Sequence, residues 1–278
     1  MCGARPAAIP NRRCLSCGEA DPAWPRAYRS PVVAAILTHV ALAFNILLAV
    51  LAIGADITAL VFYSLAHEPG SDIELTDFDT LEGVAKGLEG ATFPLLALGA
   101  AAFITWFHLV RRNAGLFLPL GHRRGTGWTI GAWITPIVQL WFPQQLMADS
   151  WDASAPVGPD GRRRPVGRGL VSAWWAAWLC SLLLTRIATD LGSWPGGPVD
   201  PRATLGADIG AGTVRIAAAV LLILVVRRLT AMQEERRAMV NPHAAAADAS
   251  ESAFGIGPVE EVVAPADGAR PADVGGGH

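Results

Sequence analysis

The stretch that decides the fold covers residues 127–151 and reads GWTIGAWITPIVQLWFPQQLMADSW. Tryptophans and prolines interrupt an otherwise apolar run: Trp128, Trp133, Trp141, Trp151, Pro136 and Pro143. A proline costs about 3 kcal/mol in a helix interior, and tryptophan is enriched where a bilayer meets water. A plain membrane-spanning helix would not carry this mixture.

The whole chain has the composition of a membrane protein. Of its 278 residues, 52% are hydrophobic and only 17% are charged, whereas soluble domains carry about a quarter charged residues. The mean hydropathy is +0.36. The basic residues fall between and after the apolar runs and form no basic face, so we expect no nucleic-acid partner. The first thirty residues lack the apolar core of a signal peptide.

Four apolar runs reach the roughly 20 residues that a bilayer crossing requires. They predict transmembrane helices over residues 31–66, 91–110, 169–190 and 208–226. His39 and Asn45 lie inside the first run, where we expect them to form hydrogen bonds between helices. Polar loops are expected over residues 67–90 and 191–207.

The chain divides into three parts. Residues 1–30 are predicted to form a cytosolic arm that contains cysteines, and residues 31–240 the membrane domain. Residues 241–278 are rich in Ala, Gly, Pro and Asp and have no apolar periodicity, so we expect a disordered tail.

Arginines on both sides of the Trp/Pro-rich segment decide its topology. Two groups flank it: Arg111, Arg112, Arg123 and Arg124 before it, and Arg162, Arg163, Arg164 and Arg168 after it. Basic loops remain in the cytosol, so residues 127–153 should enter the membrane and return, or lie in its interface. The predicted fold is therefore an all-α integral membrane protein with four transmembrane helices, a re-entrant or interfacial helical segment between helices two and three, and both termini cytoplasmic.

The second half of this segment has a helical pattern of its own. After Pro143, the residues Leu146, Met147, Ser150 and Trp151 share one face, and Gln145, Asp149 and Asp152 share the other. The pattern predicts an amphipathic interfacial helix that starts at the proline.

Three cysteines near the start of the chain raise the question of a metal. Cys14 and Cys17 form a C-x-x-C-G knuckle, and Cys2 belongs to an incomplete one because Arg5 occupies the place of its second thiolate. A zinc ribbon needs two complete knuckles. We favour a degenerate ribbon with free thiols and hence no cofactor; the alternative is zinc held with a fourth ligand from outside.

Five charged residues fall in or near the outer part of the bilayer: Asp56, Arg186, Asp190, Asp208 and Arg215. An arginine within a span usually pairs with a carboxylate or a carbonyl. The sequence therefore predicts an ion-paired cluster that joins the first, third and fourth spans. A clamp for the bundle is the role we favour, and a transport site is the alternative.

No catalytic motif stands out. The chain contains no H-E-x-x-H helix, no G-x-S-x-G elbow and no Gly-rich phosphate loop followed by lysine, so we expect no enzyme. The first hypothesis is a membrane scaffold or sensor that acts at the inner leaflet, with the lipid bilayer as partner. The second is a small-solute or ion permease that uses the outer Asp and Arg residues. A protein partner or a homo-oligomer stays open.

The chain resembles a bacterial, chiefly actinobacterial, membrane family known as domain of unknown function 4328. Four motifs over about residues 31–240 carry the resemblance: Phe103, Trp106, Arg111 and Asn113; Gly127, Trp128, Gly131, Trp133, Pro136, Leu140 and Pro143; Trp174, Trp175 and Trp178; and Arg227 to Gln233. Gln139 stands where the family pattern has Asn, which shifts the amide by one methylene. The resemblance implies the architecture and an N-terminal cysteine knuckle, and it implies no activity.

Overall fold

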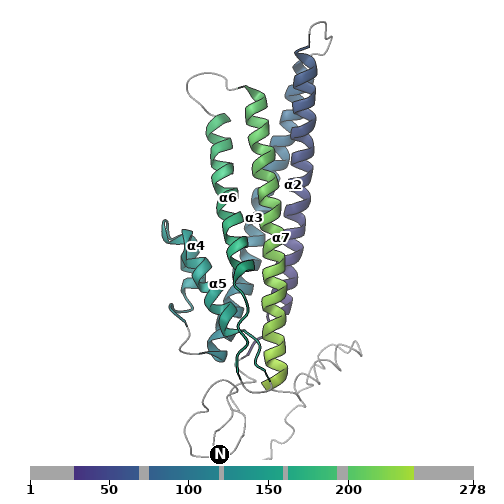
Figure 1. The fold of residues 1–278 in the computed structure, drawn as a ribbon. Helices are drawn as coiled ribbons and strands as arrows, with labels where there is room; N and C mark the ends of the chain where they lie inside the picture. Colours follow the sequence, from purple (N-terminus) through teal and green to yellow (C-terminus); the bar gives the residue numbers. More distant parts are fainter. Residues whose placement is uncertain (1–27, 69–74, 119–121, 159–161, 193–199, 241–278) are drawn as a thin grey trace, which may run out of the picture.

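The computed structural model describes residues 28–68, 75–118, 122–158, 162–192 and 200–240. Four long helices lie side by side in a bundle: α2 (Val32–Ala66), α3 (Leu75–Phe117), α6 (Gly169–Gly192) and α7 (Pro201–Val240) (Figure 1). Three short helices lie against one end of it: α4 (Trp128–Ile134), the 3-10 helix η1 (Val138–Leu140) and α5 (Phe142–Ala153). Within the described ranges the chain forms no strand beyond an isolated antiparallel bridge between Val157 and Arg163.

Each long helix contains a stretch that is long and apolar enough to cross a membrane: Val32–Ala66, Pro94–Phe117, Gly169–Leu191 and Pro201–Met239. Large apolar side chains on the outside of the bundle are exposed, as a lipid-facing surface requires; Leu37, Phe44 and Leu183 are examples. Successive long helices run in opposite directions, so the end of α3 and the start of α6 lie at the same end of the bundle (Figure 1). The predicted all-helical fold with four spans is confirmed.

Two helices extend beyond their predicted bounds. α3 begins at Leu75, so the loop expected over residues 67–90 was wrong from Leu75 onward, and Pro94 lies inside this helix. Leu75, Leu81 and Leu88, with Glu82, Ala85, Lys86 and Glu89, are good helix formers in residues 75–90. The many carboxylates of this stretch were therefore not sufficient evidence for a loop. α7 likewise begins at Pro201, within the loop expected over residues 191–207.

Small residues let α2 approach its neighbours closely. A Cβ atom at Gly99 of α3 would lie 3.4 Å from Cβ of Ala41, and one at Gly212 of α7 would lie 3.0 Å from Cγ1 of Ile53. Close backbone approach at small residues is a common way for membrane helices to pack. α2 therefore packs closely against both α3 and α7.

The two polar residues within the first span behave differently. His39 lies with Nε2 3.3 Å from the carbonyl oxygen of Ile223 on α7, which agrees with the predicted contact between helices. Asn45 instead donates from Nδ2 to the carbonyl oxygen of Ala41 in its own helix, at 2.8 Å. The prediction for Asn45 was wrong because the carbonyl four residues earlier is always within reach of a short polar side chain.

Candidate functional site

The residues that distinguish this protein from a plain four-helix bundle form one unit, which we call the end assembly. It comprises residues 122–158 and 162–168, and thus α4, η1, α5 and the loops around them. α4 has seven residues and is about 10 Å long at 1.5 Å per residue, too short for a hydrocarbon core of about 30 Å. The segment therefore does not cross the membrane as a helix.

A tight turn reverses the chain between α4 and α5. Thr135 is extended, with φ −79° and ψ 116°, because the following Pro136 disfavours helical backbone at the residue before it. Ile137 has φ 66° and is the single non-glycine residue with positive φ among the described positions. Pro143 then lies in the first turn of α5, as predicted. The two prolines thus end one helix and begin the next.

Tryptophans attach the segment from α4 to α5, residues 128–153, to the outside of the bundle. We call this segment the hairpin. The ring of Trp133 meets those of Trp175 and Trp178 on α6 edge to face, with centroids 6.2 and 5.6 Å apart, and that of Phe103 on α3 at 5.5 Å. Trp175 also donates from Nε1 to the carbonyl oxygen of Leu140 at 3.1 Å. Since Trp178 lies nine residues after Gly169, the contact is about 13 Å along the third span. The hairpin tip therefore reaches into the depth of that span.

The outer side of the hairpin presents apolar side chains to its surroundings. Ile134 and Ile137 at the tip are 74% and 70% exposed. Other exposed apolar residues flank them: Trp128, Ile130, Leu140 and Trp141. We call these six residues the apolar tip. A patch of this kind on a membrane protein fits contact with lipid chains.

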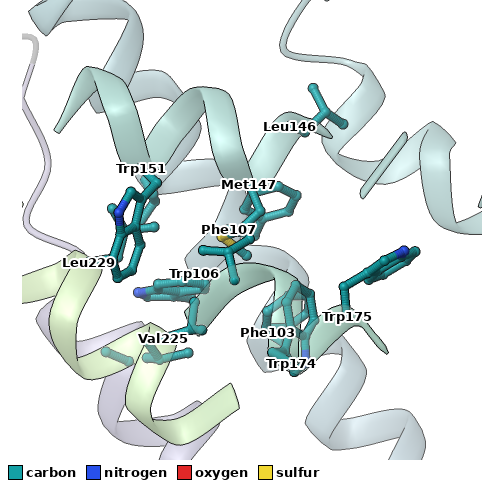
Figure 2. Close-up of a cluster of buried hydrophobic side chains, with 14 of the residues drawn as sticks. Phe103, Trp106, Phe107, Leu146, Met147, Trp151, Trp174, Trp175, Val225 and Leu229 are labelled. Carbon is teal, nitrogen blue, oxygen red and sulfur yellow. The ribbon is translucent and has the colours of Figure 1, made fainter. Parts of the chain in front are cut away.

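α5 is enclosed by protein instead of lying on the surface. Leu146, Met147 and Trp151 are fully or almost fully buried and pack with Trp106 and Leu229 in the core at this end of the bundle (Figure 2). The expectation of an amphipathic helix with a water-facing side was therefore wrong. Its carboxylates are used within the protein.

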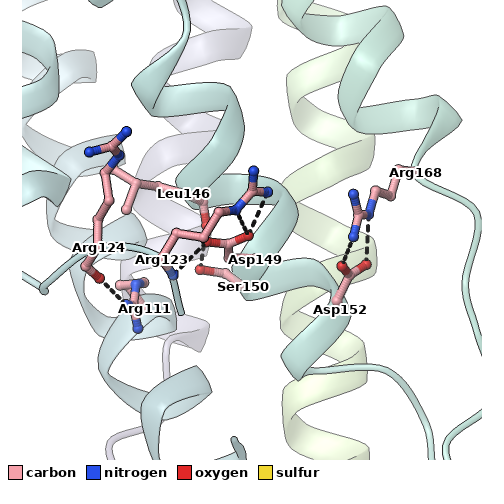
Figure 3. A network of polar contacts seen from close by, with 8 residues as sticks. All are labelled: Arg111, Arg123, Arg124, Leu146, Asp149, Ser150, Asp152 and Arg168. Carbon is pink, nitrogen blue, oxygen red and sulfur yellow. Dashed lines mark hydrogen bonds and ion pairs between the residues drawn. The ribbon is translucent and has the colours of Figure 1, made fainter. Parts of the chain in front are cut away.

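Ion pairs with the flanking arginines explain how α5 keeps its acidic residues. Asp149 is buried and accepts hydrogen bonds from the backbone N, Nε and Nη2 of Arg123 at 3.2, 3.0 and 2.9 Å. Asp152 pairs with Arg168 just before α6, and this carboxylate raises the pKa of Arg168. Figure 3 shows both pairs on neighbouring turns of α5. The arginines that indicated topology thus also hold α5 in place.

Arg111 and Arg124 complete this contact without a carboxylate. Arg111 donates from Nη2 to the carbonyl oxygen of Arg124 (Figure 3). The guanidinium carbon of Arg124 lies 3.4 Å from the ring centroid of Phe142, a cation–π contact at the start of α5. The loop before α4 is therefore joined to both α3 and α5.

A buried network of amides and hydroxyls ties the ends of α3, α5 and α7 together. Gln233 donates from Nε2 to the carbonyl oxygen of Val110 at 2.9 Å and to Oγ of Ser154 at 3.0 Å. Its Oε1 accepts from Nδ2 of Asn113 at 3.1 Å. Asn113 also donates to the carbonyl oxygen of Arg29 at 2.8 Å. Buried polar groups of this kind specify one arrangement because each lost partner is costly.

The model of one family, Domain of unknown function (DUF4328), matches residues 69–231, which is more than half of the chain. The chain belongs to the DUF4328 family. The match includes α3, the hairpin and α6 and ends within α7, so α2 lies before it. No curated protein and no solved structure matches the chain.

The four motifs that carried the resemblance to DUF4328 meet at the end assembly. Trp106 of the first motif donates from Nε1 to Oγ1 of Thr230 in the last at 3.0 Å, and Asn113 and Gln233 join the same two motifs. Trp133 of the second motif contacts the tryptophans of the third. Three residues of this site were not predicted from the sequence: Thr230, Gln233 and Asp149. Thr230 and Gln233 are three residues apart on one helical face. This spacing was the sequence pattern from which a shared polar contact could have been predicted.

Gln139 lies in η1 and is half-buried, and its backbone N donates to the carbonyl oxygen of Thr135 at 3.2 Å. The amide position that departs from the DUF4328 pattern therefore lies in the turn itself.

The structure does not join all five of the charged residues that were predicted to form a cluster in the outer part of the bilayer. Arg186 pairs with Asp190 of its own helix at 3.3 Å, and the two side chains are 73% and 56% exposed. The predicted cluster was wrong for this pair, because both side chains point away from the bundle. Asp56 is buried on α2, and Asp208 and Arg215 are half-buried on α7. Whether these three form a clamp or a transport site stays a prediction.

The metal prediction concerns residues outside the described part. Cys2, Cys14 and Cys17 lie there, as does the tail over residues 241–278. Across the described ranges, no group of three or more His, Cys, Asp or Glu side chains could hold a metal ion. Zinc at the cysteine arm therefore stays an alternative.

Proposed function

We propose that this DUF4328 protein is a non-enzymatic scaffold or sensor of the cell membrane, which works at the cytosolic leaflet through the end assembly. The observation that carries the proposal is the hairpin itself. It combines an apolar tip of six exposed side chains with a base, α5, that is buried against α3 and α7. A segment that only connected two spans would need neither feature.

The hairpin has the contacts that a sensor requires. Its tip meets α6 through Trp133, and its base meets α3 and α7 through Ser154 and Gln233. A shift of the tip in response to lipid packing would therefore move groups on three long helices. Coupling of this kind requires two arrangements of a packed element that differ in their contact with lipid.

Charge supports the cytosolic orientation. The arginines gather at the bundle end that carries the end assembly, including Arg111, Arg123, Arg163, Arg227 and Arg236. Short basic segments next to spans remain on the cytosolic side. Both termini would then be cytoplasmic, since α2 begins and α7 ends at this same end (Figure 1).

Single-cysteine labelling from each side of sealed vesicles tests the orientation. With Cys2, Cys14, Cys17 and Cys180 replaced by serine, cysteines are placed at Gly125 and Gly167, where a side chain meets open space, and at the exposed Ala203 near the other end. We expect Gly125→Cys and Gly167→Cys to react only from the cytosolic side and Ala203→Cys only from outside. Reaction of the first two from opposite sides would refute the proposal.

A small-solute or ion permease is the weaker alternative. The observation in its favour is the burial of Asp56 within a transmembrane helix, because buried charged groups in spans often mark pathways. The outward direction of Arg186 and Asp190 removes two residues from the suggested pathway. Reaction of an Ala218→Cys variant with a small water-soluble thiol reagent, at a buried α7 position, would favour the permease.

A further inference from the structure

Arg236 is a buried arginine whose hydrogen bonds within the described chain do not satisfy its whole guanidinium group. It lies in the last turns of α7 and is 2% exposed. Nη1 donates to the carbonyl oxygen of Ala155 at 3.3 Å, and the guanidinium carbon lies 5.1 Å from the ring centroid of Phe117. Nη2 is buried and has no hydrogen-bond partner. A buried cation with an unsatisfied donor is costly unless something else pairs with it.

Arg163 approaches the same place from a different element. It is held by the bridge between Val157 and Arg163, and it is half-buried between the exposed Arg162 and Arg164. Its Nη2 donates to the carbonyl oxygen of Phe117 at 3.1 Å. Both arginines thus contact Phe117, Arg163 at its carbonyl oxygen and Arg236 at its ring. The charge of Arg163 acts unfavourably on that of Arg236.

No carboxylate of the described chain neutralises the two guanidinium groups. Asp152 is the acidic residue whose charge reaches Arg163, and it is bound by Arg168. Glu234 is bound by Arg237 and by the hydroxyl groups of Tyr28 and Ser30. Burial lowers the pKa of Arg163, as expected for a cation that lacks a full counter-charge.

Helix dipoles supply part of the missing negative charge. α3 ends at Phe117 and α5 ends at Ala153, so two helix C-termini lie beside the arginine pair. Each carries roughly −0.5 of an elementary charge, against two full positive charges. Roughly one positive charge therefore remains, together with the free Nη2 of Arg236.

We propose that Arg163 and Arg236 form a binding site for a phosphate group. The two guanidinium groups come from different elements, and a tetrahedral phosphate offers oxygens in both directions, whereas a planar carboxylate matches a single guanidinium edge. Arg236 lies nine residues beyond Arg227, about 13 Å further along α7, so a soluble phosphate ester could reach the site as well as a lipid headgroup. The inference does not rest on insertion of the hairpin or on the proposed function.

Thermal unfolding of the full chain in dodecyl maltoside micelles tests the site. Tryptophan fluorescence gives the Tm in sodium chloride and in sodium phosphate at equal ionic strength, and in a third arm with added dihexanoyl phosphatidic acid. The variants are Arg236→Gln and Arg163→Gln, with Arg164→Gln as a control that loses the same charge from an exposed neighbour. We expect saturating phosphate to raise the Tm of the wild type and the control by about 5 °C, and that of the two site variants by less than about 1 °C.

The arms identify the source of the phosphate. A rise of the Tm with inorganic phosphate supports a soluble ligand, and a rise with phosphatidic acid alone supports a lipid headgroup. In both cases the rise must be lost in Arg163→Gln. No rise in any arm would overturn the proposal, and so would an equal rise in Arg163→Gln and Arg164→Gln. If Arg236→Gln does not fold, the comparison of these two adjacent variants decides.

Discussion

Replacement of Gln233 by leucine should strongly destabilise the end assembly. Gln233 is 0% exposed, and its amide makes three hydrogen bonds, to Val110, Ser154 and Asn113, at 2.9, 3.0 and 3.1 Å. Each bond contributes about 1 kcal/mol net. Leucine fills a similar volume, so little of the loss comes from a cavity. We therefore expect the free energy of unfolding to fall by about 3 kcal/mol.

The assay is reversible unfolding in mixed micelles of dodecyl maltoside and sodium dodecyl sulfate, followed by circular dichroism at 222 nm. Gln144→Leu is the control, because Gln144 is half-buried on α5 and no side-chain hydrogen bond is found for it. It should change stability by less than about 0.5 kcal/mol. A loss of less than 1 kcal/mol for Gln233→Leu, or an equal loss for the control, would mean that the hydrogen bonds of Gln233 do not stabilise the end assembly.

A double-mutant cycle then isolates one contact of the network. Asn113→Ala combined with Gln233→Leu should show a coupling of about 1 kcal/mol, since the two side chains share a hydrogen bond at 3.1 Å. Additive losses would mean that the two residues act independently.

Three further changes probe other contacts. Gly212→Ala should destabilise the bundle by about 1 kcal/mol, because its Cβ would lie 3.0 Å from Ile53, whereas Gly54→Ala meets open space and should not; chemical unfolding compares them. Burial lowers the pKa of His122 below 6.5, so the folded state favours the neutral ring, and stability that is present above pH 6.5 should fall as the pH drops below it. His122→Gln should remove the part of the Tm difference between pH 7.5 and 5.5 that comes from protonation of His122. Trp133→Ala should cost about 3 kcal/mol or more, read from the Tm, since it removes the contacts with α6.

The sequence was informative where one physical quantity dominated. Run length predicted the four long apolar helices, and the arginines around residues 127–153 predicted that this segment returns to the end of the bundle from which it starts. The prolines marked the turn because each restricts the backbone locally. These features depend on neighbouring residues or on the bilayer, so a single sequence contains them.

The sequence misled where a partner distant in the chain decided the outcome. Asp149 was assigned to a water-facing side, but Arg123, 26 residues earlier, binds it inside the protein. The direction of Arg186 depends on how α6 is rotated in the bundle, which the run of apolar residues does not fix. The network around Gln233 joins residues more than 70 positions apart. Such contacts follow from tertiary packing and from no local pattern.

In the proposed function, the hairpin inserts its apolar tip into the membrane from the side on which both its ends lie. The direct measurement is the depth of a nitrobenzoxadiazole probe on Ile137→Cys in a cysteine-free full chain in phosphatidylcholine vesicles, with Gly125→Cys as the matched control. We expect lipids with a nitroxide on the acyl chain to quench the probe at position 137, dithionite to leave it unreduced, and the control to show the reverse. Rapid reduction by dithionite at position 137 without quenching would mean that the tip lies in water and does not insert.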